Sequence, residues 1–480
     1  MTPSSPTPRD GVAHTSDVVA ALWIDAGLPS AALARLSLTG AEPALPSSFA
    51  VGTAAQSAIA VAALAATEIG RQRNGVEQTV QVDMHAAVAE CTGRFSIDGR
   101  VPDIWDKLSG LYRGANGWLR VHANFAHHRD GVLRLLGLVN LNDGAQTPRS
   151  AVEAALATRD VFAFEDAAAQ AGLVVAAVRR FDEWDAHAQG QAVAAQPLIT
   201  WERIGDAPPQ AWPAPPALPA TSRPLTGIKV LDLTRILAGP TAGRALAAYG
   251  AEVMLVNAPH LPNIDSIMDT SRGKLSCHAD LRTFEGCDSL QGLLRQAQVF
   301  VQGYRPGGLA TVGFGADQVA ALRPGIVCVS LSAYGHTGPW AGRRGFDSLV
   351  QTATGFNDAE RHAAGATSPQ AMPAQILDYS AGFLIAFAAQ AALLRQATEG
   401  GSWHLRISLA RTAQWLREMG RVPAGLAMPK PALDDCMQDY ASGWGALRAM
   451  RHAARLSHTP PGWDRPSVPP GTHAARWPVG

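Results

Sequence analysis

A buried strand that leads into a small-residue helix places the strongest limit on how this chain can fold. Residues 228–233 (IKVLDL) form a continuous apolar run typical of a buried strand, and a helix begins among the small residues after Leu237. Gly250 ends that helix, and a second apolar strand follows at residues 251–256. Strand, helix and strand in close succession predict a βαβ unit, and therefore a parallel sheet with helices packed against it.

Seven segments between Pro224 and about Gly420 resemble, in family order, the class III CoA-transferases and the related α-methylacyl-CoA racemases. The segments are the first strand with LAGPTAGR, then GAEVMLVNAP, SRGKLSCHADL, VFVQGYRPGGLATVGFG, LRPGIVCVSLSAYGHTGPW, GFDSLVQTATG and QILDYSAGFLIAFAAQAALL. Each segment alone is weakly specific, whereas the whole series in one order is specific. The resemblance implies an α/β fold, with a Rossmann-like parallel-sheet domain that binds CoA and a second, smaller α+β domain.

The acid in the last of these segments, Asp378, carries the chemistry that the resemblance implies. In the family, an aspartate at this position attacks an acyl-CoA thioester to form a mixed anhydride. It then holds CoA as an aspartyl thioester until an acceptor acid takes CoA over. The expected reaction is therefore transfer of CoA from an acyl-CoA to a free carboxylic acid. On its own, an aspartate before a helix at residues 381–394 is also typical of an N-cap, which is the structural alternative.

For CoA, the resemblance points to cations and to a helix start that meet its phosphate groups. The candidates are Arg305 in GYRPG, Arg272 and Lys274 in SRGK, and the helix start at Leu237, Ala238, Gly239 and Pro240. Each of the three cations would also fit an ordinary surface loop. CoA and its acyl group enter as substrates, and no prosthetic group is expected.

Several positions depart from the family pattern. Leu255 and Asn257 stand where the family commonly has Lys and Glu, and Leu237 where several transferases have Gln. A member that binds CoA or a partner subunit without catalysis is therefore an alternative.

The racemase branch carries His before the acid in GFDSL, because proton transfer at an α-carbon needs a base on each face. Phe346 cannot titrate, which favours a transferase over a racemase or isomerase, and Asp347 itself fits a cap of the next helix.

The chain divides by composition into six parts. They are a mobile tail (1–17), a helical segment (18–107), a small domain (108–206), a proline-rich linker (207–223), the CoA-binding catalytic domain (224–420) and a C-terminal tail packed on that domain (421–480). In the family the small domain follows the CoA-binding half, whereas here it precedes it. This order is that of a permuted or fused member.

Two stretches of the chain look alike. Residues 51–87, an Ala-rich helix followed by an alternating strand, resemble residues 382–412, so a diverged internal repeat is one interpretation. The other is that any two Ala-rich helices followed by strands look alike. No acid stands at residues 46–50, where we expect the first copy to carry its nucleophile. Family members are intertwined homodimers, so a homodimer is expected, although the half-copy could fill the partner's place within one chain.

Composition and charge argue against several other functions. The 40 basic residues balance 40 acidic ones, which disfavours nucleic acid or an anionic membrane surface as the main partner. The Ala-rich run at residues 50–66 is too short for a convincing membrane span, and the N-terminus lacks a signal pattern, so a cytoplasmic protein is expected. The 5 cysteines form no CxxC pair and are expected to be reduced thiols. His122, His127, His128 and Asp130 match no common zinc spacing, so no metal is expected.

Overall fold

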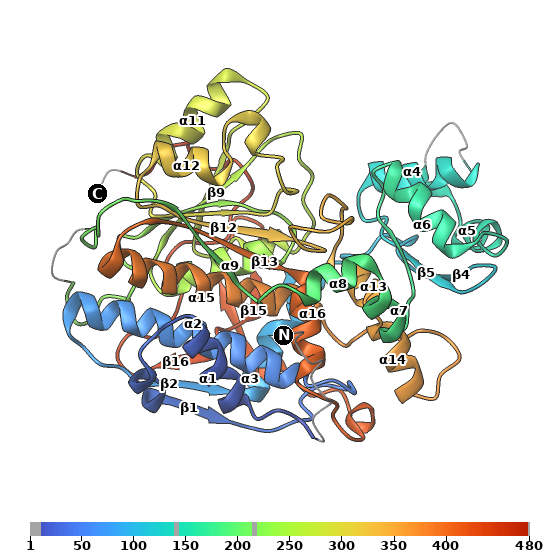
Figure 1. Ribbon diagram of the computed structural model, residues 1–480, viewed down its shortest axis with the longest axis horizontal. Helices are drawn as coiled ribbons and strands as arrows, with labels where there is room; N and C mark the ends of the chain where they lie inside the picture. Colours follow the sequence, from blue (N-terminus) through green and yellow to red (C-terminus); the bar gives the residue numbers. More distant parts are fainter. Residues whose placement is uncertain (1–10, 139–143, 214–217, 479–480) are drawn as a thin grey trace.

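The computed structural model describes residues 11–138, 144–213 and 218–478, and a seven-stranded sheet lies at its centre (Figure 1). The strands, in their order across the sheet, are β10 (Lys274–His278), β9 (Glu252–Asn257), β8 (Lys229–Leu233), β11 (Val299–Gln302), β12 (Val327–Ser332), β13 (Ser402–Ser408) and β7 (Thr200–Gly205). The first six run parallel, and β7 is antiparallel to β13. The predicted βαβ unit is confirmed as β8, α9 (Ala238–Ala248) and β9.

Helices cover both faces of this sheet because alternate strand residues point to opposite sides. Val230 and Val253 face a core under one group of helices, whereas Leu231 and Phe300 face the core under another. The first group comprises α9, α2 (Val51–Asn74) and α15 (Ile376–Glu399), and the second comprises α11 (Phe284–Leu294) and α12 (Ala316–Leu322). A sheet buried on both faces explains why its strands read as continuous apolar runs.

The direction in which the chain adds strands reverses between β8 and β11. From β8 the chain builds β9 and β10 on one side, and then returns through α11 to place β11 on the other side. It continues through α12 to β12, and through α13 (Asp347–Ala353), α14 (Phe356–Ala363) and α15 to β13. In open parallel sheets, ligands bind beyond the carboxyl ends of the strands at such a reversal. The loops after β8, β11 and β12 therefore form the expected ligand edge.

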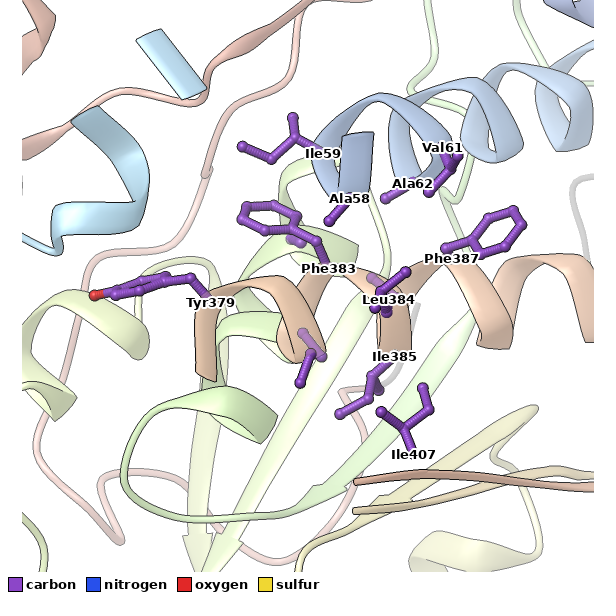
Figure 2. Packing of buried hydrophobic residues seen from close by; sticks show 14 of the residues in the cluster. Ala58, Ile59, Val61, Ala62, Tyr379, Phe383, Leu384, Ile385, Phe387 and Ile407 are labelled. Carbon is purple, nitrogen blue, oxygen red and sulfur yellow. The ribbon is translucent and has the colours of Figure 1, made fainter. Parts of the chain in front are cut away.

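Helices α2 and α15 lie side by side in the main core (Figure 2). Figure 2 shows Phe383 and Phe387 of α15 pointing toward α2, where Ala58 and Ala62 leave room for their rings. Both helices have 24 residues and are long and apolar enough to cross a membrane, but the apolar window of each is 100% buried within the protein. Their apolar character is therefore explained by their position in the core.

Small sheets tie the N-terminal segment to the C-terminal tail. The first contains β1 (Leu36–Thr39), β2 (Val80–Asp83) and β16 (Ala454–Leu456), and the second contains β14 (Met437–Tyr440), β15 (Leu447–Met450) and β3 (Phe95–Ile97). Trp477 packs in the core under α11 and α12. The tail thus contacts the large domain, as predicted, and in addition pairs with the N-terminal segment.

A buried ion cluster joins the same parts. Arg244 of α9 pairs with Glu90 of α3 (Met84–Thr92) and with Asp269 of α10 (Ile267–Thr270), and all three side chains are buried. The Glu90 carboxylate also accepts the backbone N–H of Ala453 at 2.8 Å. The N-terminal segment, the catalytic domain and the tail therefore share one charge network.

Residues 108–178, which we call the small unit, fold around a core of their own at one end of the molecule (Figure 1). Its antiparallel sheet is β4 (Gly110–Arg113), β5 (Trp118–Val121) and β6 (Val175–Ala177), and its helices are α4 (Ala126–Leu136), α5 (Arg149–Leu156) and α6 (Val161–Gln170). An Asn-Gly pair is typical of hairpin turns, and Asn116-Gly117 joins β4 to β5.

The boundaries of two predicted parts differ from the structure. After residue 178 the chain returns to the main body, where Trp184 and Val193 enter the main core and β7 joins the large sheet, so the separate core ends before the predicted residue 206. Helix α1 (Thr15–Asp25) begins inside the predicted mobile tail. The rest of that tail up to residue 10 and residues 214–217 of the predicted linker lie outside the described residues.

Candidate active site

Asp378 lies in the first turn of α15, as its third residue. The N-cap of this helix is Gln375, and no side chain caps it, so the structural alternative of an Asp378 N-cap is wrong. The side chain of Asp378 is only 7% exposed. Within the described parts of the chain, its carboxylate has no hydrogen-bond donor. Its oxygens are therefore not committed to holding the fold together.

A second acid holds the backbone of Asp378. Asp347, the first residue of α13, accepts the Asp378 backbone N–H through Oδ2 at 2.9 Å and the Gln351 Nε2–H through Oδ1 at 2.5 Å. We expected Asp347 to cap its own helix, but α13 has no side-chain cap, so that prediction is wrong. Asp347 instead satisfies one of the free N–H groups at the start of α15. The two acids are thus joined through a backbone hydrogen bond.

Burial and proximity shift the pKa values of this pair upward. Burial raises the pKa of Asp378 well above its ordinary value, and the charge of Asp347 raises it further. Burial also raises the pKa of Asp347 to about 7, although its hydrogen bonds and the charge of Arg120 act in the opposite direction. Two close carboxyls titrate as a pair. The pair therefore retains a proton near neutral pH and releases it as the pH rises.

Gly382, one turn after Asp378, lets α15 lie directly against the start of α9. A Cβ at position 382 would lie 2.6 Å from the Ala238 carbonyl oxygen and 2.8 Å from Cβ of Thr241. A larger residue would push the two helices apart. The glycine thus brings the predicted CoA-binding residues of α9 close to the helix that carries the nucleophile candidate. Leu237, Ala238, Gly239 and Pro240 are all buried in the N-cap and first turn of α9.

The loop that precedes α9 is strained. Ile236 has a φ of 78°, in a region that β-branched residues rarely adopt. Such a conformation costs on the order of 1–3 kcal/mol and is typical of functional sites. The loop follows β8, so the strain lies at the ligand edge of the sheet.

Three arginines, which we call the arginine row, occupy loops at this edge. Arg235 follows β8, Arg305 follows β11, and Arg344 precedes α13. Burial lowers the pKa of Arg344, and the charges of Arg305 and Arg235 lower it further, so the three cations lie close enough to repel one another. None of them is ion-paired with a carboxylate in the described ranges, and Arg235 donates to the Pro262 carbonyl oxygen at 2.8 Å. Uncompensated neighbouring cations favour an anionic ligand.

A pocket of about 80 Å³ lies between this edge and the small unit. Its lining residues come from both sides and are Ala169, Gly172, Leu173, Val175, Arg305, Tyr334, Gly342, Arg343 and Arg344. Arg343 forms an ion pair with Asp166 of α6 at 2.5 Å, which fixes the small unit beside the ligand edge. The small unit therefore forms one wall of the candidate site within the same chain.

The imidazole rings of His122 and His128 lie on the same side of the site, between the small unit and the start of α13. The ring of His122 stacks on Phe346, with centroids 4.0 Å apart and an interplanar angle of 18°. Nε2 of His128 lies 3.5 Å from Nη1 of Arg344. Burial lowers the pKa values of His122 and His128 to about 3, so both rings are neutral at neutral pH. Asp130, the only acid of the HHRDG segment, accepts from Arg129 Nε at 2.9 Å.

Arg272 and Lys274 lie in the interior, away from any ligand surface. Arg272 is 1% exposed and pairs with Asp269 at 2.5 Å, and Lys274 is 0% exposed and pairs with Asp232 at 2.8 Å. Their charges are already compensated by buried acids, so the prediction that they bind CoA phosphates is corrected. Lys274 Nζ also donates to the Pro240 carbonyl oxygen at 2.8 Å and thereby supports the start of α9.

The positions that depart from the family pattern are buried. Leu255 and Asn257 lie in β9 and are each 2% exposed, and Leu237 is the N-cap of α9. Arg305 was a predicted CoA-binding residue, whereas Arg235 and Arg344 were not named from the sequence. These two arginines stand just before the recognised segments LAGPTAGR and GFDSLVQTATG, so the rule for strand ends in parallel sheets could have pointed to them.

Residues 225–432 match CoA-transferase family III, and these residues contain the arginine row and both acids. The chain is therefore similar to this family over these residues. Among curated relatives, the acetyl-coenzyme A transferase nodX of Hypoxylon pulicicidum is 36% identical over 43% of this chain and 36% of its own length. An acyl-CoA transferase of Gibberella moniliformis is 30% identical over 70% of this chain and 65% of its own. The succinate–glutarate CoA-transferase of Agrobacterium fabrum is 33% identical over 40% of this chain and 52% of its own.

The alignment with the Gibberella protein covers 378 residues and therefore extends well beyond residues 225–432. The chain spans between 36% and 65% of the length of these three relatives.

Proposed function

We propose that this chain transfers CoA between an acyl-CoA and a free carboxylic acid, with Asp378 as the nucleophile. The observation that carries the proposal is the state of Asp378. It is a buried carboxylate with no donor among the described residues, fixed by Asp347 beside the ligand edge of the sheet. The family match and the names of the relatives support the same reaction. The proposed substrates are therefore an acyl-CoA and an acid.

The arginine row supplies the charge that CoA requires. The diphosphate and 3′-phosphate of CoA need several cations, and Arg235, Arg305 and Arg344 are three cations without carboxylate partners in the described chain. The first turn of α9 lies next to Asp378 through the Gly382 contact. CoA bound with its phosphates on the row would extend its thioester along α9 toward Asp378. Arg305 keeps its predicted role, and Arg235 and Arg344 replace Arg272 and Lys274.

The reaction exchanges one activated acyl bond for another. An oxygen of the Asp378 carboxylate attacks the thioester carbonyl carbon, the C–S bond breaks, and CoA leaves as a thiolate, which gives a mixed anhydride. The thiolate attacks the aspartyl carbonyl carbon, and the acyl group leaves as a carboxylate. The acceptor carboxylate then attacks the aspartyl thioester, and the same steps run in reverse. Only the ionised form of Asp378 can begin this sequence.

The pKa values of the two acids set the pH dependence. Because burial and Asp347 raise the pKa of Asp378, the nucleophile is protonated in acid and ionises as the pH rises. We therefore expect the rate of CoA loading onto Asp378 to be low in acid and to increase with pH. A desolvated carboxylate is also more reactive than a hydrated one. Burial thus lowers the ionised fraction and raises the reactivity of that fraction.

Phe346 distinguishes this proposal from a racemase. Its ring precedes Asp347 and stacks on a neutral imidazole, so this position offers no titratable group as a second base. A non-catalytic CoA-binding role would leave the uncommitted carboxylate of Asp378 unexplained. A transferase gives a role to both Asp378 and Asp347.

The test is to trap the activated aspartate. Wild-type protein and the variants Asp378→Asn and Asp288→Asn are incubated with acetyl-CoA or succinyl-CoA and hydroxylamine, and the modified residue is mapped by mass spectrometry. Asp288 is an exposed acid on α11 and serves as the matched control. An aspartyl hydroxamate at Asp378 in wild type and the control variant, absent from Asp378→Asn, is the expected result. CoA binding without any trapped aspartate, or α-proton exchange in deuterated water without an acceptor acid, would overturn the proposal.

We propose that the site of one chain is complete without a helix from a second chain. α2 packs on α15 and the small unit walls the site within one chain, so each chain holds the parts that this reaction uses. A homodimer in the cytoplasm remains our expectation for the protein. Light scattering during size-exclusion chromatography measures the assembly, and activity that persists at dilutions where the protein is monomeric would support a site complete in one chain.

A further inference from the structure

An imidazole, a carboxylate and a thiol meet where the N-terminal segment contacts the C-terminal tail. His85 is the second residue of α3, and Asp435 and Cys436 are the last residues of the short 3₁₀ helix η5 (Asp434–Cys436), which leads into β14. One ligand atom from each of the three side chains lies within 4.8 Å of the other two. We call these three residues the tail cluster. They come from opposite ends of the chain, so no metal-binding spacing in the sequence marks them.

The spacing of the tail cluster suits a small divalent ion. Nε2 of His85 lies 3.6 Å from Oδ1 of Asp435. Zinc binds nitrogen and oxygen at about 2.0–2.2 Å and thiolate sulfur at about 2.3 Å, so the ligand atoms around a tetrahedral zinc ion lie about 3.3–3.7 Å apart. The imidazole and the carboxylate already have this separation. A shift of at most about 1 Å gives the thiol of Cys436 the same separation from them.

An ion can reach the tail cluster from solvent. The side chain of Asp435 is 69% exposed and that of His85 is 42% exposed, whereas Cys436 is 2% exposed. The thiol packs with Ala89 of α3 and Met450 of β15, so the sulfur lies on the protein side of the cluster. An ion bound to the three side chains would therefore keep its fourth position open to water, as zinc does in sites with three protein ligands.

The charges around the thiol are compatible with a divalent ion. Burial raises the pKa of the Cys436 thiol, and the charge of Asp435 raises it further, whereas the charge of Arg451 acts in the opposite direction. The carboxylate thus lies beside the thiol. Arg94, a second cation near η5, is paired with Asp434 at 3.4 Å. Together, a thiolate at Cys436 and the carboxylate of Asp435 would balance the two positive charges of the ion.

The three ligand types decide which ion fits. Magnesium and calcium prefer oxygen ligands alone, whereas thiolate and imidazole together are typical of zinc sites, which also accept a carboxylate. We propose that His85, Asp435 and Cys436 bind a zinc ion that fastens the C-terminal tail to helix α3. None of the three residues belongs to the candidate active site, so this inference does not rest on the proposed transfer of CoA.

The position of the tail cluster indicates what the ion would do. Helix α3 leads into β3 and η5 leads into β14, and these are the two outer strands of one three-stranded sheet. An ion held by α3 and η5 would therefore cross-link the two segments that enter this sheet. Because the unfolded chain does not hold the three ligands together, zinc should bind the folded protein and stabilise it.

The experiment titrates the whole, metal-free protein with Co²⁺ and with Zn²⁺. Bound cobalt reports a thiolate ligand through a charge-transfer band in the near ultraviolet, and elemental mass spectrometry after gel filtration counts bound zinc. The ligand variants are Cys436→Ala, His85→Gln and Asp435→Asn. The controls are Cys287→Ala, which removes a half-buried thiol on α11, and His458→Gln, which removes an exposed histidine of the tail.

We expect wild type and both controls to bind one Zn²⁺ per chain and to show the cobalt band. The band should be absent from Cys436→Ala. The Kd should rise at least tenfold in His85→Gln and Asp435→Asn, because loss of a partner outside the ligand shell already weakens metal binding by about 10–100-fold. Free zinc at about a hundredfold above Kd should raise the Tm of wild type by about 3 °C, and that of His85→Gln by at most half as much.

Three results would overturn the zinc site. They are wild type that retains no Zn²⁺, a cobalt band that persists in Cys436→Ala or disappears in Cys287→Ala, and an unchanged Kd in both His85→Gln and Asp435→Asn. Circular dichroism of each variant identifies loss of folding. If Cys436→Ala does not fold, the two variants at the more exposed positions 85 and 435 decide the question.

Discussion

The substitution Asp378→Asn should make the protein more stable at pH 8 while it removes the proposed nucleophile. Asn has the shape of Asp, and the Asp378 side chain forms no hydrogen bond with a described group that the change would remove. The backbone N–H that bonds to Asp347 is unchanged. What disappears is a carboxyl that burial and a neighbouring acid keep from ionising freely.

The sign and size of the effect follow from the raised pKa values. Between the ordinary value of 3.8 and the folded value, the folded protein holds a proton that the unfolded chain releases, so stability falls as the pH rises through this window. Asp347 reaches about 7, and at about 1.4 kcal/mol per pKa unit burial of such an acid costs on the order of 4 kcal/mol above pH 7. Asp378 is a second acid whose pKa is raised, by burial and by Asp347, so its removal should increase the free energy of unfolding at pH 8. Since unfolding entropy is about 2.1 cal/mol/K per residue, cooperative unfolding of this chain raises Tm by about 1 °C for each kcal/mol gained.

Differential scanning calorimetry of wild type and Asp378→Asn at pH 8 and pH 4 measures this directly. The Tm gain should be present at pH 8 and much smaller at pH 4, where both acids are protonated in the folded state and only partly ionised in the unfolded state. A variant that is less stable at pH 8, or a gain of equal size at both values, would refute the assignment of a strained, buried acid pair.

Three further changes test other parts of the site. Arg235→Met should raise the Kd of CoA about tenfold in titration calorimetry, with a smaller effect at high salt; an unchanged Kd would remove this residue from the arginine row. Arg244→Met should lower the free energy of unfolding by about 3–5 kcal/mol in denaturant titration, because two buried carboxylates lose their partner; a loss below 1 kcal/mol would contradict a structural role. Gly382→Ala should reduce hydroxamate formation at least tenfold, because the added methyl group moves α15 away from α9. Gly292→Ala is the control, since a Cβ there meets open space, and it should leave hydroxamate formation unchanged. Equal rates of hydroxamate formation in the two variants would show that the contact at Gly382 does not position the nucleophile.

The fold was predictable where local pattern and burial coincide. The strands at residues 228–233 and 251–256 both appear near their predicted bounds, because each is specified by neighbouring residues. The pairing of the C-terminal tail with the N-terminal segment was not predicted, since β2 and β16 are far apart in the sequence and neither carries a signal for its partner. The return of β7 to the large sheet escaped prediction for the same reason.

The sequence named Asp378 as the candidate nucleophile, but it indicated only some of the residues around Asp378. The basic residues of SRGK suggested phosphate binding, yet Arg272 and Lys274 meet buried acids that come from other segments. Charge in a sequence does not reveal whether it is compensated in the fold. The role of Asp347 was missed because its partner, the backbone N–H of residue 378, is a group that every non-proline residue carries.

The similarity between residues 51–87 and residues 382–412 gains detail from the structure. α2, β2 and α3 follow one another in the order of α15, β13 and α16 (Leu409–Glu418). The residues before the two long helices also share an unusual backbone conformation, with φ −76° and ψ 58° at Ala50 and φ −78° and ψ 61° at Gln375. Equal helix lengths, equal starts and direct packing between α2 and α15 favour a common origin over two unrelated Ala-rich helices.

Alignment of the two helix starts places Thr53, rather than residues 46–50, opposite Asp378. The Thr53 backbone N–H donates to Glu42 Oε1 at 2.7 Å, just as the Asp378 N–H donates to Asp347 Oδ2 at 2.9 Å. The start of α2 thus has a supporting carboxylate, with a hydroxyl where α15 has the acid proposed as the nucleophile. A hydroxyl cannot form an aspartyl anhydride, and the arginine row that would receive CoA lies at the edge of the seven-stranded sheet, whereas the parallel strands β1 and β2 belong to a separate small sheet. We therefore expect one molecule of CoA to be loaded per chain, and two per chain would show that the α2 end also binds and activates an acyl group.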